Sequence, residues 1–377
     1  MLRTMQYRLR PTKKPAHRLE AQLEECRTLS NHFVETRNRA WDERQESLSF
    51  PQQAVTLPGL QQRCPELSQV SSQVLQNVAL RVDLAFKAFF RRCKAGETPG
   101  HPRFRGYGRY DSMTYPQYDR GWHLTGGVLK LSKVGAIRVI EHRPLEGIPK
   151  TCTIRRASLR KWSVTITCAF DPHVLPETGA AVGIDVGLLS FTTLSTGEST
   201  PCPQFLRTDA QDLKRTQRQR SAATRGTPER RKRRAMVRRV YERIRNRRTN
   251  FAHQESRKLV NRFDVIAVED VSVHRLVHHH GLAKSIQDAA WSQFATCLSY
   301  KAAWAGRAFV AVNPAYTSQD CSSCGHRQHK TLAVRIHQCA CCGLTLDRDH
   351  NAAVNILRLG LQSLGLVPRS SAVHGGE

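Results

Sequence analysis

The sequence has 377 residues, 40% of them hydrophobic, and its 59 Lys and Arg residues outnumber 31 Asp and Glu residues, which gives a formal net charge of +28. This length and apolar content suffice for more than one folded domain and exclude a chain that is disordered throughout. No run approaches the ~20 apolar residues that cross a bilayer, and the basic start lacks the apolar core of a signal peptide. We therefore expect no membrane partner and a cytoplasmic protein. Because a polyanion neutralises so much positive charge, the composition favours a nucleic acid as partner.

The N-terminal half combines strand-like and helical segments. Residues 4–10 alternate apolar and polar side chains, and two helical patterns follow, separated by a Pro/Gln-rich break at 51–62. Residues 98–120 are predicted to be a loop because they are rich in Arg, Tyr, Gly and Pro. Further strands are predicted at 128–132, 137–140, 151–156 and 162–169. These patterns predict a small β-barrel built from 1–14 and 98–178, with 15–97 as a helical insert.

From residue 181 onward the pattern becomes α/β. Short apolar strands alternate with longer helical segments, and one charged helical region is predicted over 207–260. The predicted strands are 182–185, 191–194, 265–268 and 308–312. A helix is expected over 290–304 and another after Asp349, and the polar tail at 365–377 is predicted to be disordered.

Three acidic positions follow or flank apolar segments of this α/β region. Asp185 ends one apolar strand, Glu269 ends a second with Asp270 beside it, and a helix opens with Asp347 and Asp349. Buried carboxylates need a cation or a raised pKa, and their oxygen atoms suit Mg²⁺. Two such ions can clamp the oxygens of a phosphodiester displacement. The residues themselves leave open which acid of each adjacent pair is the ligand.

Two Cys-x-x-Cys pairs predict a closed metal site. Cys321 and Cys324 form the first pair, Cys339 and Cys342 the second, and a glycine follows each pair. Four thiolates at this spacing are typical of one structural Zn²⁺, with Cys341 as a spare thiol. The run of histidines at 278–280 has no partner at ligand spacing and is expected to be an exposed loop.

Basic residues are concentrated in two segments. Interleaved Arg and aromatic residues in the loop suit phosphate neutralisation combined with base stacking, and the contacts that we select there are Arg103, Arg105 and Tyr107. The charged helical region is the second segment, because Arg binds phosphate through a bidentate fork. The contacts that we select there are Lys214, Arg215, Arg218, Arg231, Arg234, Arg238 and Arg245.

Taken together, these motifs resemble the transposon-associated TnpB family, relatives of the compact type V CRISPR effectors. The resemblance covers most of the chain and is looser in the N-terminal half, where it depends mainly on 102–104. The motifs in chain order are Gly183–Gly187, Val268–Asp270, Leu282–Ile286 with Trp291, Tyr316–Gly325 and Cys342–Ile356. Two departures are the histidines at 278–280, where relatives often have Asn, and His337 in place of an aromatic residue.

The resemblance implies a fold and a set of roles. It implies an RNase H-like (RuvC) nuclease domain over 179–316 and 344–364, a zinc ribbon inserted at 317–343, and a wedge-type barrel with a helical recognition insert. Asp185, Glu269 and Asp349 would bind two Mg²⁺, which favours Asp349 over Asp347. The implied partners are a guide RNA from the transposon end and a double-stranded DNA target beside a short motif, because base pairing then selects the sequence.

We therefore expect an RNA-guided DNA endonuclease in a prokaryotic cytoplasm, with its activity at the nucleoid. One alternative is an RNA-guided DNA-binding regulator on the same scaffold that does not cleave, and the presence of all three acids argues against it. Another is a DNA-transposing recombinase of RNase H fold, against which the resemblance argues.

Overall fold

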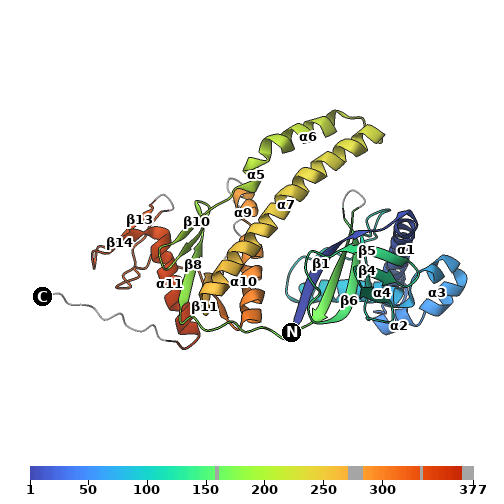
Figure 1. The fold of residues 1–377 in the computed structure, drawn as a ribbon, viewed down its shortest axis with the longest axis horizontal. Coiled ribbons are helices and arrows are strands. Elements are labelled where there is room, and N and C mark those ends of the chain that lie inside the picture. The colour runs from blue at the N-terminus through green and yellow to red at the C-terminus, as the bar shows by residue number, and fades with distance from the viewer. Residues whose placement is uncertain (158–160, 271–282, 332–333, 367–377) are drawn as a thin grey trace. The chain divides into compact units, whose positions relative to one another are not determined.

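A computed structural model describes residues 1–157, 161–270, 283–331 and 334–366. The histidines at 278–280, Leu282 and positions 367–377 of the predicted tail lie outside the described residues. The chain divides into two compact units, Met1–Asp171 and Pro172–Glu377, which are described separately (Figure 1). Within the described residues, no helix is long and apolar enough to cross a membrane.

The first unit contains a seven-stranded antiparallel sheet that curls into a nearly closed barrel. Its order is β2-β6-β7-β1-β5-β4-β3. The first strand of the chain, β1, lies between β7 and β5, so the N-terminus supplies a central strand. The strands are β1 (Leu2–Arg10), β2 (Ser112–Tyr115), β3 (Trp122–Thr125), β4 (Val128–Leu131), β5 (Gly135–Ile140), β6 (Ile148–Arg156) and β7 (Trp162–Ala169). The prediction that 98–120 is entirely loop was wrong for β2, which pairs with β6.

The segment between β1 and β2 forms the helices of this unit. They are α1 (Lys13–Arg44), α2 (Phe50–Ala54), α3 (Leu57–Arg63), the 3-10 helix η1 (Pro65–Gln69) and α4 (Ser72–Lys94). The predicted break at 51–62 was wrong, because α2 and α3 lie there. Each of these short helices carries a Pro in its first turn, where the missing N–H costs no helical hydrogen bond.

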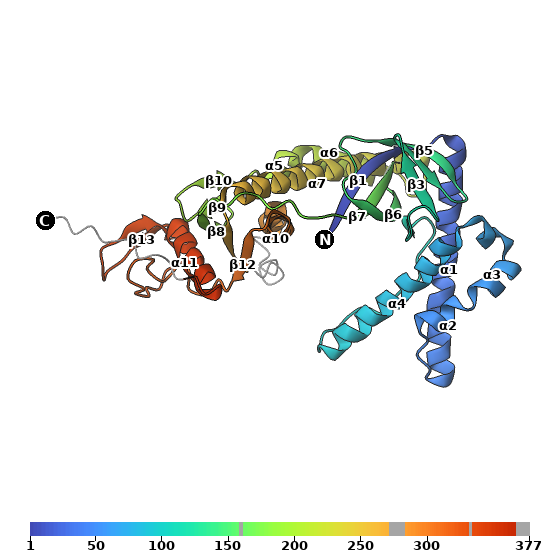
Figure 2. The same ribbon diagram turned by 60° about the horizontal axis from the view of Figure 1, so that its bottom comes forward.

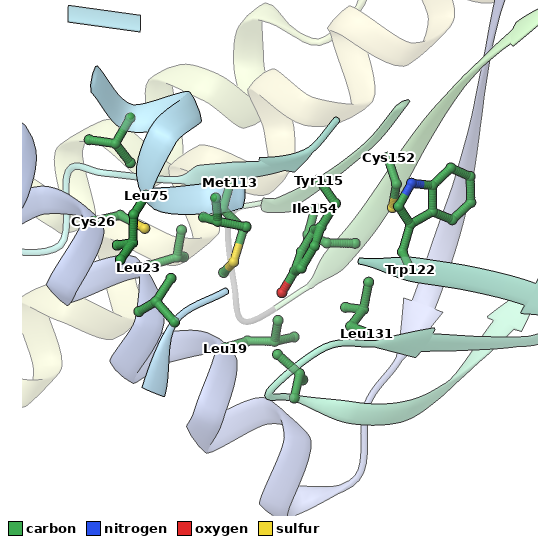
Figure 3. Packing of buried hydrophobic residues seen from close by; sticks show 14 of the residues in the cluster. Leu19, Leu23, Cys26, Leu75, Met113, Tyr115, Trp122, Leu131, Cys152 and Ile154 are labelled. Carbon is green, nitrogen blue, oxygen red and sulfur yellow. The ribbon is translucent and has the colours of Figure 1, made fainter. Parts of the chain in front are cut away.

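One hydrophobic core joins these helices to the barrel. Leu19 and Leu23 from α1 and Leu75 from α4 lie against Met113 and Ile154 from the sheet (Figure 3). All five side chains are at most 1% exposed. The apolar stripes of the two long helices are therefore core, as their helical spacing indicates.

The second unit is built on a five-stranded mixed sheet with the order β10-β9-β8-β11-β12. Strand β11 runs parallel to both of its neighbours, and β9 is antiparallel to β8. The strands are β8 (Ala181–Val186), β9 (Ser190–Leu194), β10 (Ser199–Pro201), β11 (Val265–Glu269) and β12 (Ala308–Val312). Helix α11 (Arg348–Ser363) packs on one face of the sheet, against β8 and β11.

The other face of this sheet is covered by α7 (Pro228–Arg262) and α10 (Trp291–Ala305), which share a core with β8 and β11. The charged region at 207–260 is two antiparallel helices rather than one, because α6 (Ala210–Ala222) ends before the 223–227 turn (Figure 2). Helix α7 is about 52 Å long at 1.5 Å per residue. Two short helices, α5 (Phe205–Thr208) and α9 (Ala283–Ala289), complete this side.

Candidate nuclease site and metal centre

The central strand β8 presents Asp185 to the face covered by α11. Side chains alternate between the two faces of a strand. Val182 and Ile184 are fully buried in the core beneath α10, so Gly183 and Asp185 belong to the opposite face. A Cβ atom on Gly183 would lie 2.1 Å from the carbonyl oxygen of Ala353 in α11. Glycine is therefore required at this position for the helix to pack directly on the strand.

Strand β11 brings Glu269 beside Asp185. Ile184 is in register with Val268, so each acid follows a paired residue on its own strand. The backbone N–H of Val186 donates to Oε1 of Glu269 over 3.3 Å, which fixes this carboxylate at the end of the strand. Asp270 is exposed, and its backbone pairs with Val312. Of the two adjacent acids, Glu269 is therefore the one whose side chain is fixed at the end of the strand.

Helix α11 begins with the two acids that the sequence could not distinguish. Oδ1 of Asp347 accepts hydrogen bonds from the backbone N–H groups of Asp349 (2.8 Å) and His350 (3.2 Å). Asp347 is therefore the N-cap of the helix, and capping engages its carboxylate. Asp349, in the first turn, is the acid whose charge raises the pKa of both Asp185 and Glu269, whereas the charge of Asp347 acts on Asp185 alone and is the smallest of its causes.

Burial and neighbouring negative charges disfavour the ionised forms of Asp185 and Glu269. Burial, followed by the charges of Glu269 and Asp349, raises the pKa of Asp185 well above its usual value. Burial raises the pKa of Glu269 to about 7; the Val186 N–H opposes this rise and the charge of Asp349 adds to it. Among the described residues, the group of His, Cys, Asp and Glu side chains placed to hold a metal ion is the cysteine cluster, and the three carboxylates do not form a second one in this structure.

Two arginines at this site were missed by the sequence reasoning. Arg348 contacts Oδ1 of Asp349 at 3.1 Å, and Nη1 of Arg335 lies 3.8 Å from Oδ2 of the same carboxylate. Arg335 lies 14 positions before Asp349, and the second cysteine pair lies between them, so the two residues share no single helix or strand. Only the adjacency of Arg348 to two acids was a usable signal.

The four predicted cysteines converge. The sulfur atoms of Cys321, Cys324, Cys339 and Cys342 all lie within 4.8 Å of one another, so the cluster could hold a metal ion. Backbone N–H groups, first that of Cys342, lower the pKa of Cys339 to about 6, which favours the thiolate that binds metal. Cys341 is exposed and outside the cluster, consistent with a spare thiol.

The cysteine segment is attached to the first turns of α11. Strand β13 (Ile336–Gln338) pairs with β14 (Thr345–Asp347), which leads into the helix. The fully buried Asn351 accepts from the N–H of Ser322 (2.9 Å) and donates to the carbonyl of Asp320 (2.8 Å). Asn355 donates to the same carbonyl at 2.7 Å. The two asparagines thus connect the helix that carries Asp349 to the first cysteine pair.

His337, the residue noted as a departure, lies in β13 and is fully buried. Its Nδ1 contacts Nζ of Lys330. Burial, followed by the charge of Lys330, lowers the pKa of His337, which favours the neutral imidazole.

The basic helices contain two classes of arginine. Arg243 pairs with Asp209 at 2.7 Å and Arg248 pairs with the buried Asp288 at 2.6 Å, so these side chains hold α7 to neighbouring segments. The selected residues are all exposed: Lys214, Arg215, Arg218, Arg231, Arg234, Arg238 and Arg245. Of these, Arg215 is paired with Asp212 at 3.0 Å.

Four of the exposed arginines form one stripe along α7. Arg231, Arg234, Arg238 and Arg245 recur at intervals of three, four and seven residues, which places them on one face of the helix. Within the described ranges, none of them forms a salt bridge with an acidic side chain. The stripe is therefore available to bind an anionic partner.

The predicted loop contacts lie in the first unit. Arg103 is exposed, Tyr107 is 86% exposed, and the guanidinium of Arg105 lies 5.5 Å from the ring centroid of Tyr110. The backbone N–H of Arg105 donates to Asn31 of α1 at 2.8 Å, which anchors this segment to the helices.

Comparison with known proteins identifies the family. Residues 165–279 match a family model described as "Probable transposase" (OrfB_IS605), and residues 291–356 match one described as "Cas12f1-like, TNB domain". A Streptomyces pristinaespiralis protein named "Putative RNA-guided DNA endonuclease" is 36% identical over 368 residues, which cover 95% of this chain and 89% of that protein.

More distant relatives agree with this result. The Escherichia coli protein named "Putative RNA-guided DNA endonuclease InsQ" is 29% identical over 306 residues, covering 77% of this chain and 74% of that protein. The solved structure of the mini-RNA-guided endonuclease CRISPR-Cas_phi3 aligns with a TM-score of 0.50 at 8% identity, covering 96% of this chain and 92% of that one, which is a likeness of fold. The sequence motifs, the family models and the extent of identity agree: this chain belongs to the TnpB family of transposon-associated, RNA-guided DNA endonucleases.

Proposed function

We propose that this chain cleaves DNA selected by a guide RNA, with two Mg²⁺ ions held by Asp185, Glu269 and Asp349. The guide would come from the end of an insertion-sequence transposon, and the target would be a DNA duplex beside a short motif. The names of the relatives support the RNA-guided endonuclease activity. The residues of the site support the metal-dependent chemistry.

One observation carries the catalytic part of this proposal. Two acids end adjacent parallel strands and a third begins the helix across them: the charge of Asp349 raises the pKa of both strand acids, and the charge of Glu269 raises the pKa of Asp185. Hard oxygen donors whose negative charges act on one another suit divalent cations, and the three carboxylates would hold two such ions. The donor set therefore fits Mg²⁺.

The chain's own residues would prepare the reaction. Asp185 and Glu269 would lose their protons to become ligands, and the N–H of Val186 would keep the Glu269 carboxylate in place. Arg335 and Arg348, which pair with Asp349 in this structure, would bind a phosphate oxygen of the target once metal ions neutralise that carboxylate. When bound, the metal ions supply Lewis-acid stabilisation of the attacking and leaving oxygens of the phosphodiester.

We assign the cysteine cluster to one structural Zn²⁺. The Sγ–Sγ distances of 3.5 Å (Cys324–Cys339) and 3.6 Å (Cys321–Cys342) are near the ~3.8 Å edge of a tetrahedron with bonds of ~2.3 Å. Four thiolates leave no open coordination position, so this ion would organise the 317–343 ribbon rather than take part in catalysis.

The remaining parts suit the guide and target. The sheet order and the acids at its strand ends support an RNase H-like (RuvC) domain over 179–316 and 344–364. The barrel of 1–14 and 98–178 and its helical insert of 15–97 would form the wedge and recognition parts. The arginine stripe of α7 would bind phosphates without reading sequence, as suits a protein that leaves sequence selection to base pairing.

The test is a matched pair of alanine variants. Protein expressed with its flanking transposon end is purified with its bound RNA, the RNA is sequenced, and a matching DNA duplex is offered with Mg²⁺. Asp185→Ala should abolish cleavage and retain RNA-dependent DNA binding, whereas Asp270→Ala, which removes an exposed acid next to Glu269, should still cleave. Cleavage by Asp185→Ala would show that the site is wrong. Binding without cleavage by the unmodified protein would favour the non-cleaving regulator.

A further inference from the structure

A cavity of about 460 Å³ lies beside the candidate nuclease site, on the side of the sheet opposite α11. Glu269 forms part of its wall, as does Val186, the residue after Asp185. Helix α10 and strand β12 supply the other walls. The cavity therefore includes one proposed catalytic acid, Glu269, in its wall and lies one residue from another, Asp185, along β8.

The walls of this cavity are apolar and aromatic. Trp291 and Phe294 of α10 and Phe309 of β12 line it, and Trp291 and Phe294 are 7% and 1% exposed. Both large rings are fixed by the surrounding core, so the cavity is preformed. Its volume is in the range of small-ligand sites.

The described polar groups of the cavity do not suit a phosphate ligand. Its described lining contains no Lys or Arg, and its only charged residues are the acids Glu269 and Asp270. The lining also contains three exposed residues with hydroxyl groups on successive turns of α10, which are Ser292, Thr296 and Ser299. An uncharged flat ring with hydrogen-bonding edges fits such a site, and an anion does not.

We propose that this cavity binds the nucleobase of a nucleotide next to the scissile phosphate. The inference rests on the proposed function, because Glu269 marks where that phosphate would lie. A DNA strand crossing the strand ends would place its phosphate at the acids and turn one base toward Trp291 and Phe309. The basic residues of the chain would hold the backbone, and this cavity would fix the position of the cut.

The test combines base removal with filling of the cavity. After the cut is mapped with the purified RNA-bound protein, DNA targets are made with a single abasic site at each nucleotide flanking it. Ala295→Phe adds a ring from the α10 wall, and Ala311→Phe adds one from an exposed position on β12. Ala303→Phe is the control, because it is an exposed Ala on α10 outside the cavity lining.

One abasic position should slow cleavage by the unmodified protein about 5- to 150-fold, the range expected for one stacked base. Each cavity-filling variant should slow cleavage of intact DNA by a similar factor. In these variants, the same abasic site should reduce the cleavage rate little further. Ala303→Phe should behave like the unmodified protein.

Two results would overturn the inference: equal cleavage of every abasic target, or losses that multiply when the variants and the abasic site are combined. Thermal melting of both variants excludes misfolding as a cause. If the unmodified protein cuts no DNA at all, the proposed function fails instead.

Discussion

The contact between Gly183 and helix α11 determines how close Asp349 can come to the sheet. In Gly183→Ala, the new Cβ would lie 2.1 Å from the Ala353 carbonyl oxygen and 2.5 Å from the Leu357 backbone nitrogen. Ordinary contact begins at 3.4 Å, so strand and helix must separate by about 1 Å. Both obstacles are backbone atoms, which no change of rotamer can remove.

The energetic cost follows from this overlap. Overpacking a close contact costs about 1–3 kcal/mol. Each kcal/mol lowers the midpoint of thermal unfolding by about 2–4 °C in a unit of 150–250 residues. We therefore expect Gly183→Ala to melt about 2–12 °C lower, and a displacement of about 1 Å at the acids to slow cleavage about 100-fold.

The assays are thermal unfolding followed by circular dichroism and cleavage at saturating target DNA. Gly59→Ala is the matched control, since a Cβ on this α3 glycine meets no atom within 4 Å and alanine is the better helix former. Gly360→Ala tests the other end of α11, where the Cβ would lie 2.4 Å from that of Ala267. If Gly183→Ala melts and cleaves as the unmodified protein does, α11 does not pack on β8 as described.

Three other predictions concern metal, pH and charge. Cys324→Ser should lose zinc and Cys341→Ser should keep it, as measured by metal analysis of the purified proteins; equal zinc content in the two would contradict the assigned ligands. The pKa of Glu269 is raised from 4.5 to about 7. The folded metal-free protein therefore binds more protons than the unfolded chain over this window, so its stability should fall as pH rises through it, while Mg²⁺ affinity, followed by calorimetric titration, rises. A Mg²⁺ affinity independent of pH between 5.5 and 7.5 would refute this role for Glu269. Arg238→Gln should reduce the salt dependence of RNA binding by about one counterion and leave the melting temperature unchanged. Arg243→Gln, which breaks the ion pairs to Asp209 and Asp212, should lower the melting temperature.

The sequence predicted the parts of this protein that depend on local patterns. The apolar stripes of α1 and α4, the strands that carry the acids and the spacing of the cysteines all have periods or distances that can be read along the chain. The errors arose where one residue type is typical of two different structures, as proline is of breaks and of helix starts. Pro51 and Pro58 were taken as part of a break between helices, yet each lies in the first turn of one.

The choice between Asp347 and Asp349 could not be made from the residues, because both precede the same apolar helix. The structure separates them by hydrogen bonding, since Asp347 caps the helix through two backbone N–H groups. Arg335 was not found for a different reason. Its approach to Asp349 depends on how the ribbon folds back onto α11, a tertiary contact with no local signature.

That fold-back couples the proposed zinc site to the proposed catalytic site. The carbonyl of Arg335 accepts the backbone N–H of Arg348 at 2.7 Å, and Asn351 holds the first cysteine pair to the same helix turn. A helix start held on both sides in this way cannot shift without breaking these hydrogen bonds. Because Asp349 lies between these attachments, a folded ribbon fixes its position relative to Asp185. We therefore expect the thiolate cluster to influence cleavage indirectly, by fixing the position of the Asp349 carboxylate.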